Sequence, residues 1–179
     1  MRTLHLTERD YKTSRWSGGT TTELFIWPEG ADYAKREFSF RVSSAVVELA
    51  ESDFTPLAGV TRYITPLTGG FTLTHPGKPA VVMPPLAEPY RFSGEEATHC
   101  VGCATDFNLM LKGTRGEMTL CSGSAPIRPG FNGFYALEDG VFTLAGLHEM
   151  KAGDMLVVFA EDAATIDLGG KVIACWAEV

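Results

Sequence analysis

The sequence predicts an all-β protein of the barrel or sandwich type, and three observations lead to this prediction. Short stretches rich in Val, Ile, Thr and aromatic residues recur along the 179 residues. They are punctuated by 19 glycines and 10 prolines, the residues that favour turns. The turn signals follow one another at the spacing of about 8–12 residues that is typical of sandwiches and barrels.

We predict fifteen strands from this texture and from the turn residues between them. In chain order they are Thr21–Trp27, Phe38–Val47, Arg62–Leu67, Gly70–His75, Ala80–Met83, Tyr90–Phe92, Thr98–Gly102, Thr105–Lys112, Gly116–Cys121, Gly133–Ala136, Val141–Leu144, Leu147–Met150, Met155–Phe159, Thr165–Leu168 and Val172–Ala177. Only two segments, Tyr33–Phe38 and Pro56–Val60, are predicted to form short helical turns.

Two segments share one plan and sharpen the fold prediction. Leu67–His75 reads as a strand, a Gly turn and a second strand. Leu147–Phe159 reads as a short strand, a Gly-Asp turn and a buried apolar strand. Units of this kind resemble the jelly-roll barrels of the cupin class. We therefore expect a jelly-roll, cupin-like double barrel in a single chain.

The repeat divides the chain into two expected lobes. The N-terminal lobe spans residues 1–112 and carries the polar motifs described below, and the C-terminal lobe spans residues 113–179. The junction at Lys112–Gly116 is short. We expect the lobes to pack closely and form one compact unit.

Composition excludes several classes of function. The chain is 45% hydrophobic and 21% charged, which suits a folded domain with a buried core. Its net charge of −7 and the absence of a Lys/Arg run argue against nucleic acid as a partner. No apolar run is long enough to span a membrane, and the N-terminus lacks the apolar core of a signal peptide. We expect a cytoplasmic protein.

The histidines do not predict a metal site. A metal-binding cupin strand usually carries two histidines at i and i+2, whereas the four histidines of this chain lie far apart: His5, His75, His99 and His148. We expect no metal and no cofactor. Cys100 and Cys103 form a lone CxxC pair without the context of a zinc knuckle or a thioredoxin motif, so we interpret them as reduced structural thiols.

Two polar stretches, 41–45 and 106–110, carry most of the functional information. Side chains at i and i+2 of a strand share a face, so Arg41 and Ser43 point away from Phe40. In the same way, Asp106, Asn108 and Met110 share one face, and Phe107 and Leu109 point to the other. If these polar faces line a concave interior, they form a ligand pocket. A solvated face would produce the same alternation.

The residue types suggest how such a pocket would bind a carboxylate. Arg41 and Arg62 can each offer a bidentate fork, while Asp106 and Glu23 balance their charge. Neutral hydrogen bonds would come from Thr21, Ser43 and Asn108, and apolar walls from Trp16, Phe54 and Met110. A structural salt-bridge network, Arg41–Asp106 or Arg62–Glu23, explains the charged residues equally well.

The same residues make the chain resemble a known family, the HutD/Ves family of bacterial cupin-like proteins. The matching pieces are Trp16–Leu24, Phe40–Ala45, Phe54–Arg62, Leu67–Gly69, Phe92–Glu95 and Asp106–Met110. One branch of the family has an Asn-Gly pair after its Trp, whereas Trp16 is followed here by Ser17-Gly18-Gly19.

The resemblance implies a single-chain bicupin that binds a small molecule and is linked to histidine utilisation. An acidic intermediate such as formylglutamate or urocanate fits this expectation. Carried over position by position, the candidate ligand-binding residues are Trp16, Thr21, Glu23, Arg41, Ser43, Arg62, Asp106, Asn108 and Met110.

Three hypotheses follow. The first is a non-enzymatic binding protein that buffers or reports a carboxylate metabolite. The second is a metal-free cupin enzyme, an isomerase or hydrolase, with Asp106 or Glu23 as the general base. The third is an interaction protein without a ligand. Because jelly-roll edges often pair across a dimer, a homodimer is a further expectation.

Overall fold

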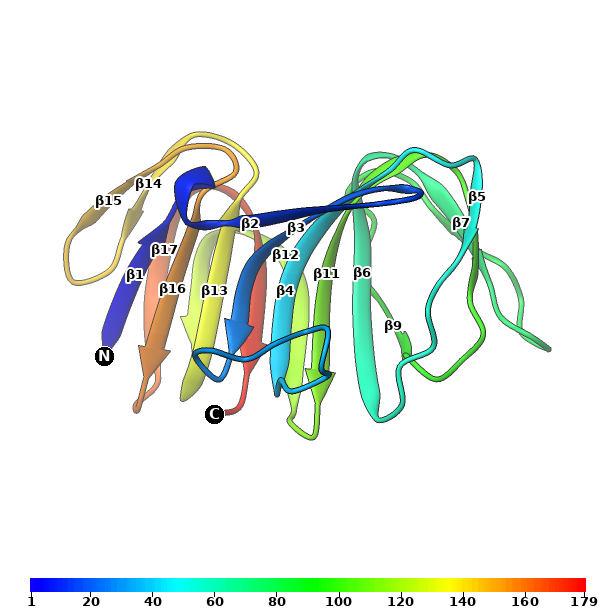
Figure 1. The fold of residues 1–179 in the computed structure, drawn as a ribbon. Helices are drawn as coiled ribbons and strands as arrows, with labels where there is room; N and C mark the ends of the chain where they lie inside the picture. The colour runs from blue at the N-terminus through cyan, green and yellow to red at the C-terminus, as the bar shows by residue number, and fades with distance from the viewer. The chain divides into compact units, whose positions relative to one another are not determined.

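The computed structural model describes all residues, 1–179, and is built from strands with one short 3-10 helix, Glu8–Asp10. The chain forms two compact units (Figure 1). One unit is Lys12–Gly113, and the other combines Met1–Tyr11 with Thr114–Val179. No helix of the structure has the length and apolar character needed to cross a membrane.

The Lys12–Gly113 unit contains two antiparallel sheets. The six-stranded sheet has the order β2-β3-β4-β11-β6-β9. Its strands are β2 (Lys12–Trp16), β3 (Gly19–Trp27), β4 (Phe40–Val47), β11 (Ala104–Lys112), β6 (Val60–Gly69) and β9 (Tyr90–Ser93). The four-stranded sheet has the order β5-β10-β7-β8, with β5 (Glu51–Asp53), β10 (His99–Val101), β7 (Phe71–Thr74) and β8 (Val81–Met83).

A hydrophobic cluster joins these two sheets. Ile64 and Phe92 contribute from the six-stranded sheet, and Leu73, Met83 and Cys100 contribute from the four-stranded sheet. All five side chains are buried, so the two sheets close over a common core as the walls of a barrel do. Burial of this apolar area is the main term that stabilises the unit.

The other unit is built on one sheet with the order β1-β16-β13-β17-β14-β15, to which β12 adds by pairing with β17. Its strands are β1 (Arg2–Leu6), β12 (Gly116–Ile127), β13 (Gly130–Ala136), β14 (Gly140–Thr143), β15 (Leu147–Met150), β16 (Met155–Ala160) and β17 (Ala164–Ala177). Its interior is filled by apolar side chains, among them Phe134, Phe142 and Ile166.

Most predicted strands are present, and the differences have physical reasons. Three strands were not expected: β1, β2 and β5. β2 and β5 are short and polar and bury no residue, so they lack the alternation on which the prediction depended. The segments predicted separately as Thr165–Leu168 and Val172–Ala177 form one strand, β17, with an irregular register opposite Cys121–Gly123.

The predicted helical turns at Tyr33–Phe38 and Pro56–Val60 are wrong, because neither segment is helical. In the first, the Asp32 carboxylate accepts a hydrogen bond from the Ala34 backbone N–H at 2.8 Å. This side-chain contact competes with helix formation and leaves a series of turns.

The boundary of the lobes also differs from the expected division at residue 112. β1 pairs along its whole length with β16, from Arg2 opposite Phe159 to Leu6 opposite Met155. The first eleven residues therefore belong to the unit that contains Thr114–Val179. A polar N-terminal segment gives no sign of so distant a partner, because edge pairing is set by backbone hydrogen bonds.

Candidate functional site

A cavity of about 400 Å³ lies within the Lys12–Gly113 unit. Its size is typical of small-molecule sites. We call it the arginine cavity. Eight of the nine residues predicted to bind a ligand lie in its wall: Trp16, Thr21, Arg41, Ser43, Arg62, Asp106, Asn108 and Met110. The ninth, Glu23, contacts the cavity residue Arg41.

Strand register brings these residues together in rows across the six-stranded sheet. In one row, Arg41 of β4, Met110 of β11 and Arg62 of β6 lie directly opposite one another. In the next, Asn108 lies opposite Ser43, which in turn lies opposite Glu23 of β3. Because residues opposite each other in a sheet are neighbours, the alternation of each strand becomes one polar surface.

A third row carries Thr21, Ala45 and Asp106, again opposite one another on β3, β4 and β11. The register of β3 shifts between Glu23 and Phe25, as in a β-bulge. The bulge changes which side chains of β3 face the cavity side, so the strict alternation of the sequence does not continue to Trp27.

Arg41 is held by two hydrogen bonds and one aromatic ring. Its Nε donates to Glu23 Oε2 at 2.7 Å, and its Nη1 donates to Ser43 Oγ at 3.3 Å. Its guanidinium lies 4.1 Å from the centre of the Tyr33 ring. The side chain is buried, and its charge is balanced by Glu23, so Arg41 is fixed in place.

Arg62 is buried as well, but no carboxylate contacts it. Its Nη2 donates to Asn108 Oδ1 at 3.1 Å, and Asn108 Nδ2 donates to Asp106 Oδ1. Its guanidinium lies 4.6 Å from the Phe54 ring centre and 5.3 Å from that of Phe92. Its Nε is buried and has no hydrogen-bond partner. A buried cation with an unused donor is an unusual arrangement that suits an incoming anion.

The structure forms neither of the salt bridges considered from the sequence, Arg41–Asp106 and Arg62–Glu23. Arg41 pairs with Glu23 instead, and Asn108 stands between Arg62 and Asp106. The charges are therefore arranged as one direct ion pair and one pair joined through an amide. Because Asn108 separates Arg62 from Asp106, these two charges neutralise each other only weakly.

Asp106 is buried, and burial raises its pKa from 3.8 to about 7. The Arg62 charge, the Ala45 backbone N–H and the Asn108 side chain all lower this pKa, but burial outweighs them. Burial also lowers the pKa of Arg62. Near neutral pH, Asp106 can therefore act either as a hydrogen-bond donor or as an anion.

The Trp-Ser-Gly-Gly motif shapes the rim of the cavity. A Cβ at Gly18 would overlap the ring of Trp16, at 2.1 Å from Cζ3, so the indole packs directly on this glycine. A Cβ at Gly19 would lie 1.8 Å from the Val46 carbonyl oxygen. The two glycines allow the indole to fold over the turn and β3 to start beside β4.

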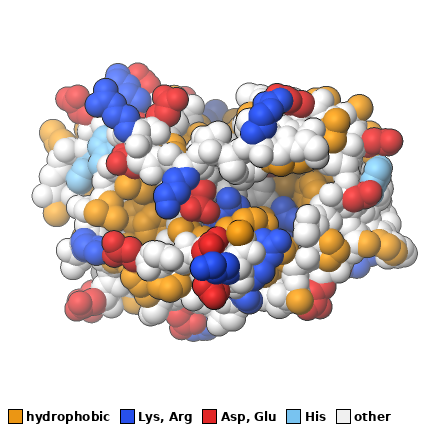
Figure 2. Space-filling view, in the orientation of Figure 1, with side chains coloured by type: hydrophobic (Ala, Val, Ile, Leu, Met, Phe, Trp, Pro, Cys, Tyr) orange, Lys and Arg blue, Asp and Glu red, His pale blue; other side chains and the backbone are white.

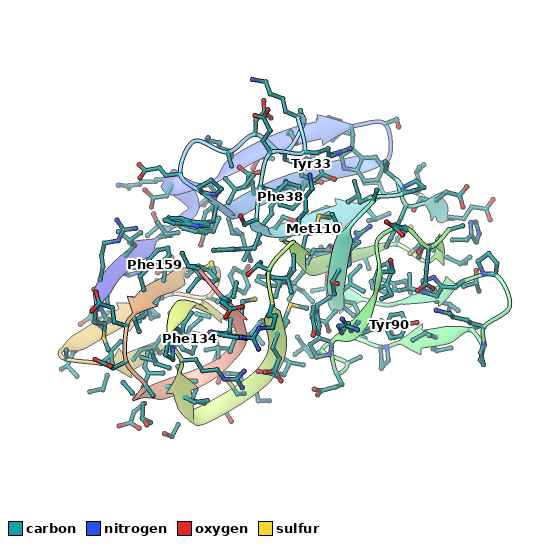
Figure 3. The ribbon with its side chains drawn as sticks, turned by 90° about the horizontal axis from the view of Figure 1, so that it is seen from below. Tyr33, Phe38, Tyr90, Met110, Phe134 and Phe159 are labelled. Atoms are coloured by element: carbon teal, nitrogen blue, oxygen red, sulfur yellow. The ribbon has the colours of Figure 1, made fainter.

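Several cavity residues were not predicted: Ser14, Tyr33, Arg36, Ala45, Val47, Ser52, Asp53 and Thr55. The alternation of β4 already places Ala45 on the same face as Arg41 and Ser43, and its continuation reaches Val47. Tyr33 and Arg36 lie in the segment expected to be helical. The Arg36 guanidinium is 4.5 Å from the Tyr33 ring centre, so this ring contacts both Arg36 and Arg41. Tyr33, Phe38 and Met110 lie close together (Figure 3).

The family model described as HutD matches residues 8–176. The chain belongs to the HutD family. This family is linked to histidine utilisation. No curated protein sequence matches the chain.

Solved structures agree with this assignment. HutD from Pseudomonas fluorescens SBW25, solved in a formate condition, has a TM-score of 0.85 and 22% identity, over 99% of this chain and 98% of that one. A conserved protein of unknown function from Pseudomonas aeruginosa PAO1 has a TM-score of 0.81 and 22% identity over the same shares. At these identities the likeness shows the fold.

A bacterial pirin from Escherichia coli in complex with nickel(II) has a TM-score of 0.67 and 11% identity, over 99% of each chain. The structural neighbours of this chain are bicupins, and the prediction of an all-β, cupin-like double barrel is confirmed. In this chain, no three His, Cys, Asp or Glu side chains converge as a group that could hold a metal ion. The arginine cavity instead offers cations and hydrogen-bond donors, which do not fit a metal ion.

Proposed function

We propose that the arginine cavity binds a small carboxylate metabolite and that the protein acts in the cytoplasm by buffering or reporting its concentration, without catalysis. Arg62 carries this proposal. It is a buried cation with no carboxylate in contact and an unused Nε, in the wall of a cavity. A ligand carboxylate would supply the missing charge and accept from the guanidinium.

The other cavity residues would orient the ligand. Arg41 keeps Nη2 outside its bonds to Glu23 and Ser43, so it can donate to the same carboxylate. Thr21, Ser43 and Asn108 offer neutral partners for a second polar end. Trp16, Phe54 and Met110 provide apolar walls. The link of the family to histidine utilisation makes formylglutamate and urocanate the first candidates.

A thermal-shift screen tests the proposal. Histidine, urocanate, formiminoglutamate, formylglutamate, glutamate and formate would each be added at millimolar concentration. A ligand at about 100 times its Kd stabilises the fold by about 2.7 kcal/mol, a readily measured rise in Tm. We expect a shift for at least one acid. A flat response to all six would favour a protein-interaction role without a small ligand.

An enzymatic role is the second candidate, and the raised pKa of Asp106 favours it. A carboxyl group that titrates near pH 7 can serve as a general acid or base. Glu23 is less suited to this role, because its carboxylate is already bound to Arg41 at 2.7 Å. Conversion of any of the six acids by the wild type, and its loss in Asp106→Asn, would replace the binding proposal with catalysis.

A further inference from the structure

Tyr33 lies in the wall of the arginine cavity but belongs to no strand. It is part of the segment 28–39 that connects β3 with β4, which we call the strap. An isolated β-bridge between Asp32 and Glu37 folds the strap back on itself around Tyr33. The strap therefore adds side chains to a cavity whose wall is otherwise formed mainly by strands.

The Tyr33 ring contacts two guanidinium groups. Its centre lies 4.1 Å from that of Arg41 and 4.5 Å from that of Arg36, and both contacts are favourable to a cation. The ring also packs with Met110, which lies between Arg41 and Arg62 in the row across β4, β11 and β6 (Figure 3). Tyr33 therefore stands beside the row that carries both buried arginines.

The Tyr33 hydroxyl has no hydrogen-bond partner within the protein. The hydrogen bonds of this residue are those that its backbone carbonyl accepts from Arg36. The side chain is only half-buried, and its hydroxyl is open to the cavity. A tyrosine in such surroundings usually pairs its hydroxyl, so this one is a donor that a ligand can use.

Electrostatics places this donor near Arg62. Burial lowers the pKa of Arg62, and Asp106 and Tyr33 oppose this shift. The hydroxyl is therefore within electrostatic range of the Arg62 guanidinium. A carboxylate bound to Arg62 would find in the hydroxyl a second donor, and a hydrogen bond to an ionised acceptor is stronger than one between neutral groups.

Arg36 holds the strap in this position. Its Nη1 donates to the Tyr33 carbonyl oxygen at 2.9 Å, and its own carbonyl oxygen accepts from Lys112 Nζ at 2.6 Å. Its φ of 61° is a left-handed conformation that residues other than glycine seldom adopt. Such strain persists only where surrounding contacts enforce it, and it is concentrated at ligand sites.

We propose that Tyr33 is a ligand-binding residue of the arginine cavity, whose hydroxyl donates to the carboxylate held by Arg62, and that Arg36 is its positioning residue. This contact rests on the proposed function, because it requires a carboxylate at Arg62. The alternative is that Tyr33 serves only as an aromatic platform for Arg36 and Arg41. Tyr33→Phe separates the two roles, since it keeps the ring and removes only the hydroxyl.

Calorimetric titrations of the wild type and Tyr33→Phe with formylglutamate and with formate test the contact. Formate consists of the carboxylate alone. We expect Tyr33→Phe to bind both probes about tenfold more weakly, as for the loss of a hydrogen bond to a charged group. Unchanged affinities would overturn the contact. A loss with formylglutamate alone would place the hydroxyl at the other end of the ligand and would also overturn it.

Tyr90→Phe is the matched control, because Tyr90 is half-buried as well but lies outside the cavity wall. It should bind both probes as the wild type does, and an equal loss in both variants would overturn the contact. Arg62→Gln separates this contact from the proposed function. If Arg62→Gln weakens binding and Tyr33→Phe does not, the carboxylate site stands and the Tyr33 contact is wrong. If the wild type binds neither probe, both are wrong.

The positioning role of Arg36 has its own test. Arg36→Ala should weaken formylglutamate binding about as much as Tyr33→Phe does, and Arg36→Lys should restore it by keeping a cation beside the ring. Added to Tyr33→Phe, Arg36→Ala should cause no further loss, because both changes remove the same contact. A further loss, or no rescue by lysine, would overturn this role.

Discussion

Asp106 is a buried carboxyl group, and burial removes the water that would otherwise stabilise its charged form. Three neighbours lower its pKa: Arg62, the Ala45 backbone N–H and the Asn108 side chain. Burial acts in the opposite direction, and Asp106 in turn adds to the raised pKa of the buried Cys100 thiol. Because burial dominates, the pKa of Asp106 lies at about 7 in the folded protein, against 3.8 for an ordinary Asp. The charge state of the cavity therefore changes within the physiological pH range.

We predict that carboxylate affinity falls as pH rises above about 7. Protonated Asp106 leaves the two arginines opposed only by Glu23, whereas ionised Asp106 repels the ligand anion. The loss should approach about tenfold per pH unit when one proton is taken up with the ligand. Calorimetric titrations at several pH values would measure this. In Asp106→Asn the slope should vanish, and an unchanged slope would assign the titration to another group.

Stability should depend on the same proton. Between the ordinary pKa of Asp and the folded value of about 7, the folded protein binds more protons than the unfolded chain. The contribution of Asp106 to the free energy of unfolding therefore decreases as pH rises through this window and is constant above it. Urea unfolding of the wild type and of Asp106→Asn should diverge in this range, with the wild type losing more stability on going from pH 5 to pH 7.

At the scale of elements, the turn between β2 and β3 requires a glycine at position 19. Gly19 has φ 151°, and a Cβ there would meet the Val46 carbonyl oxygen at 1.8 Å. We predict that Gly19→Ala lowers the free energy of unfolding by about 2–4 kcal/mol, because the β3–β4 pairing must open.

Gly59→Ala is the matched control for this turn. Gly59 has φ 69°, but its Cβ would meet no atom within 4 Å. The cost should be about 1–2 kcal/mol, from backbone strain alone. Urea denaturation of the two variants gives the comparison. Equal losses would show that the contact with Val46 does not constrain the turn.

The site could be predicted from the sequence where the residues alternate on long strands. Arg41, Ser43, Asp106 and Asn108 lie on β4 and β11, and their shared face follows from a period of two. The pairing of Arg41 with Glu23 could not be predicted, because it depends on register and on the bulge in β3. Tyr33 was missed for a different reason, since a loop has no period.

At the scale of the whole molecule, the fold class followed from strand texture and turn spacing. The N-terminal strand did not, because β1 pairs with β16 across most of the chain's length. Such distant edge pairings leave no local pattern. On the face shown in Figure 2, basic and acidic side chains are interspersed.

We predict that deleting residues 1–6 destabilises the unit that contains Thr114–Val179 and leaves the arginine cavity functional. The deletion exposes the edge of β16 and removes the contacts of Arg2 with Phe159 and of His5 with Asp154. A loss of about 1–3 kcal/mol is expected. Thermal unfolding would measure the loss of stability. A rise in Tm on adding the carboxylate would show that the arginine cavity still binds it. Unchanged stability would show that β1 is dispensable.

The most direct test of the account is a calorimetric titration of the wild type and Arg62→Gln with the carboxylate that gives the largest thermal shift. Arg15→Gln is the control, because Arg15 is exposed and pairs with Glu48 outside the cavity. Removing a buried charged partner of a ligand costs about 2–5 kcal/mol, so Arg62→Gln should bind at least about thirtyfold more weakly than the wild type and the control. Equal affinities for all three proteins would contradict a carboxylate site at Arg62.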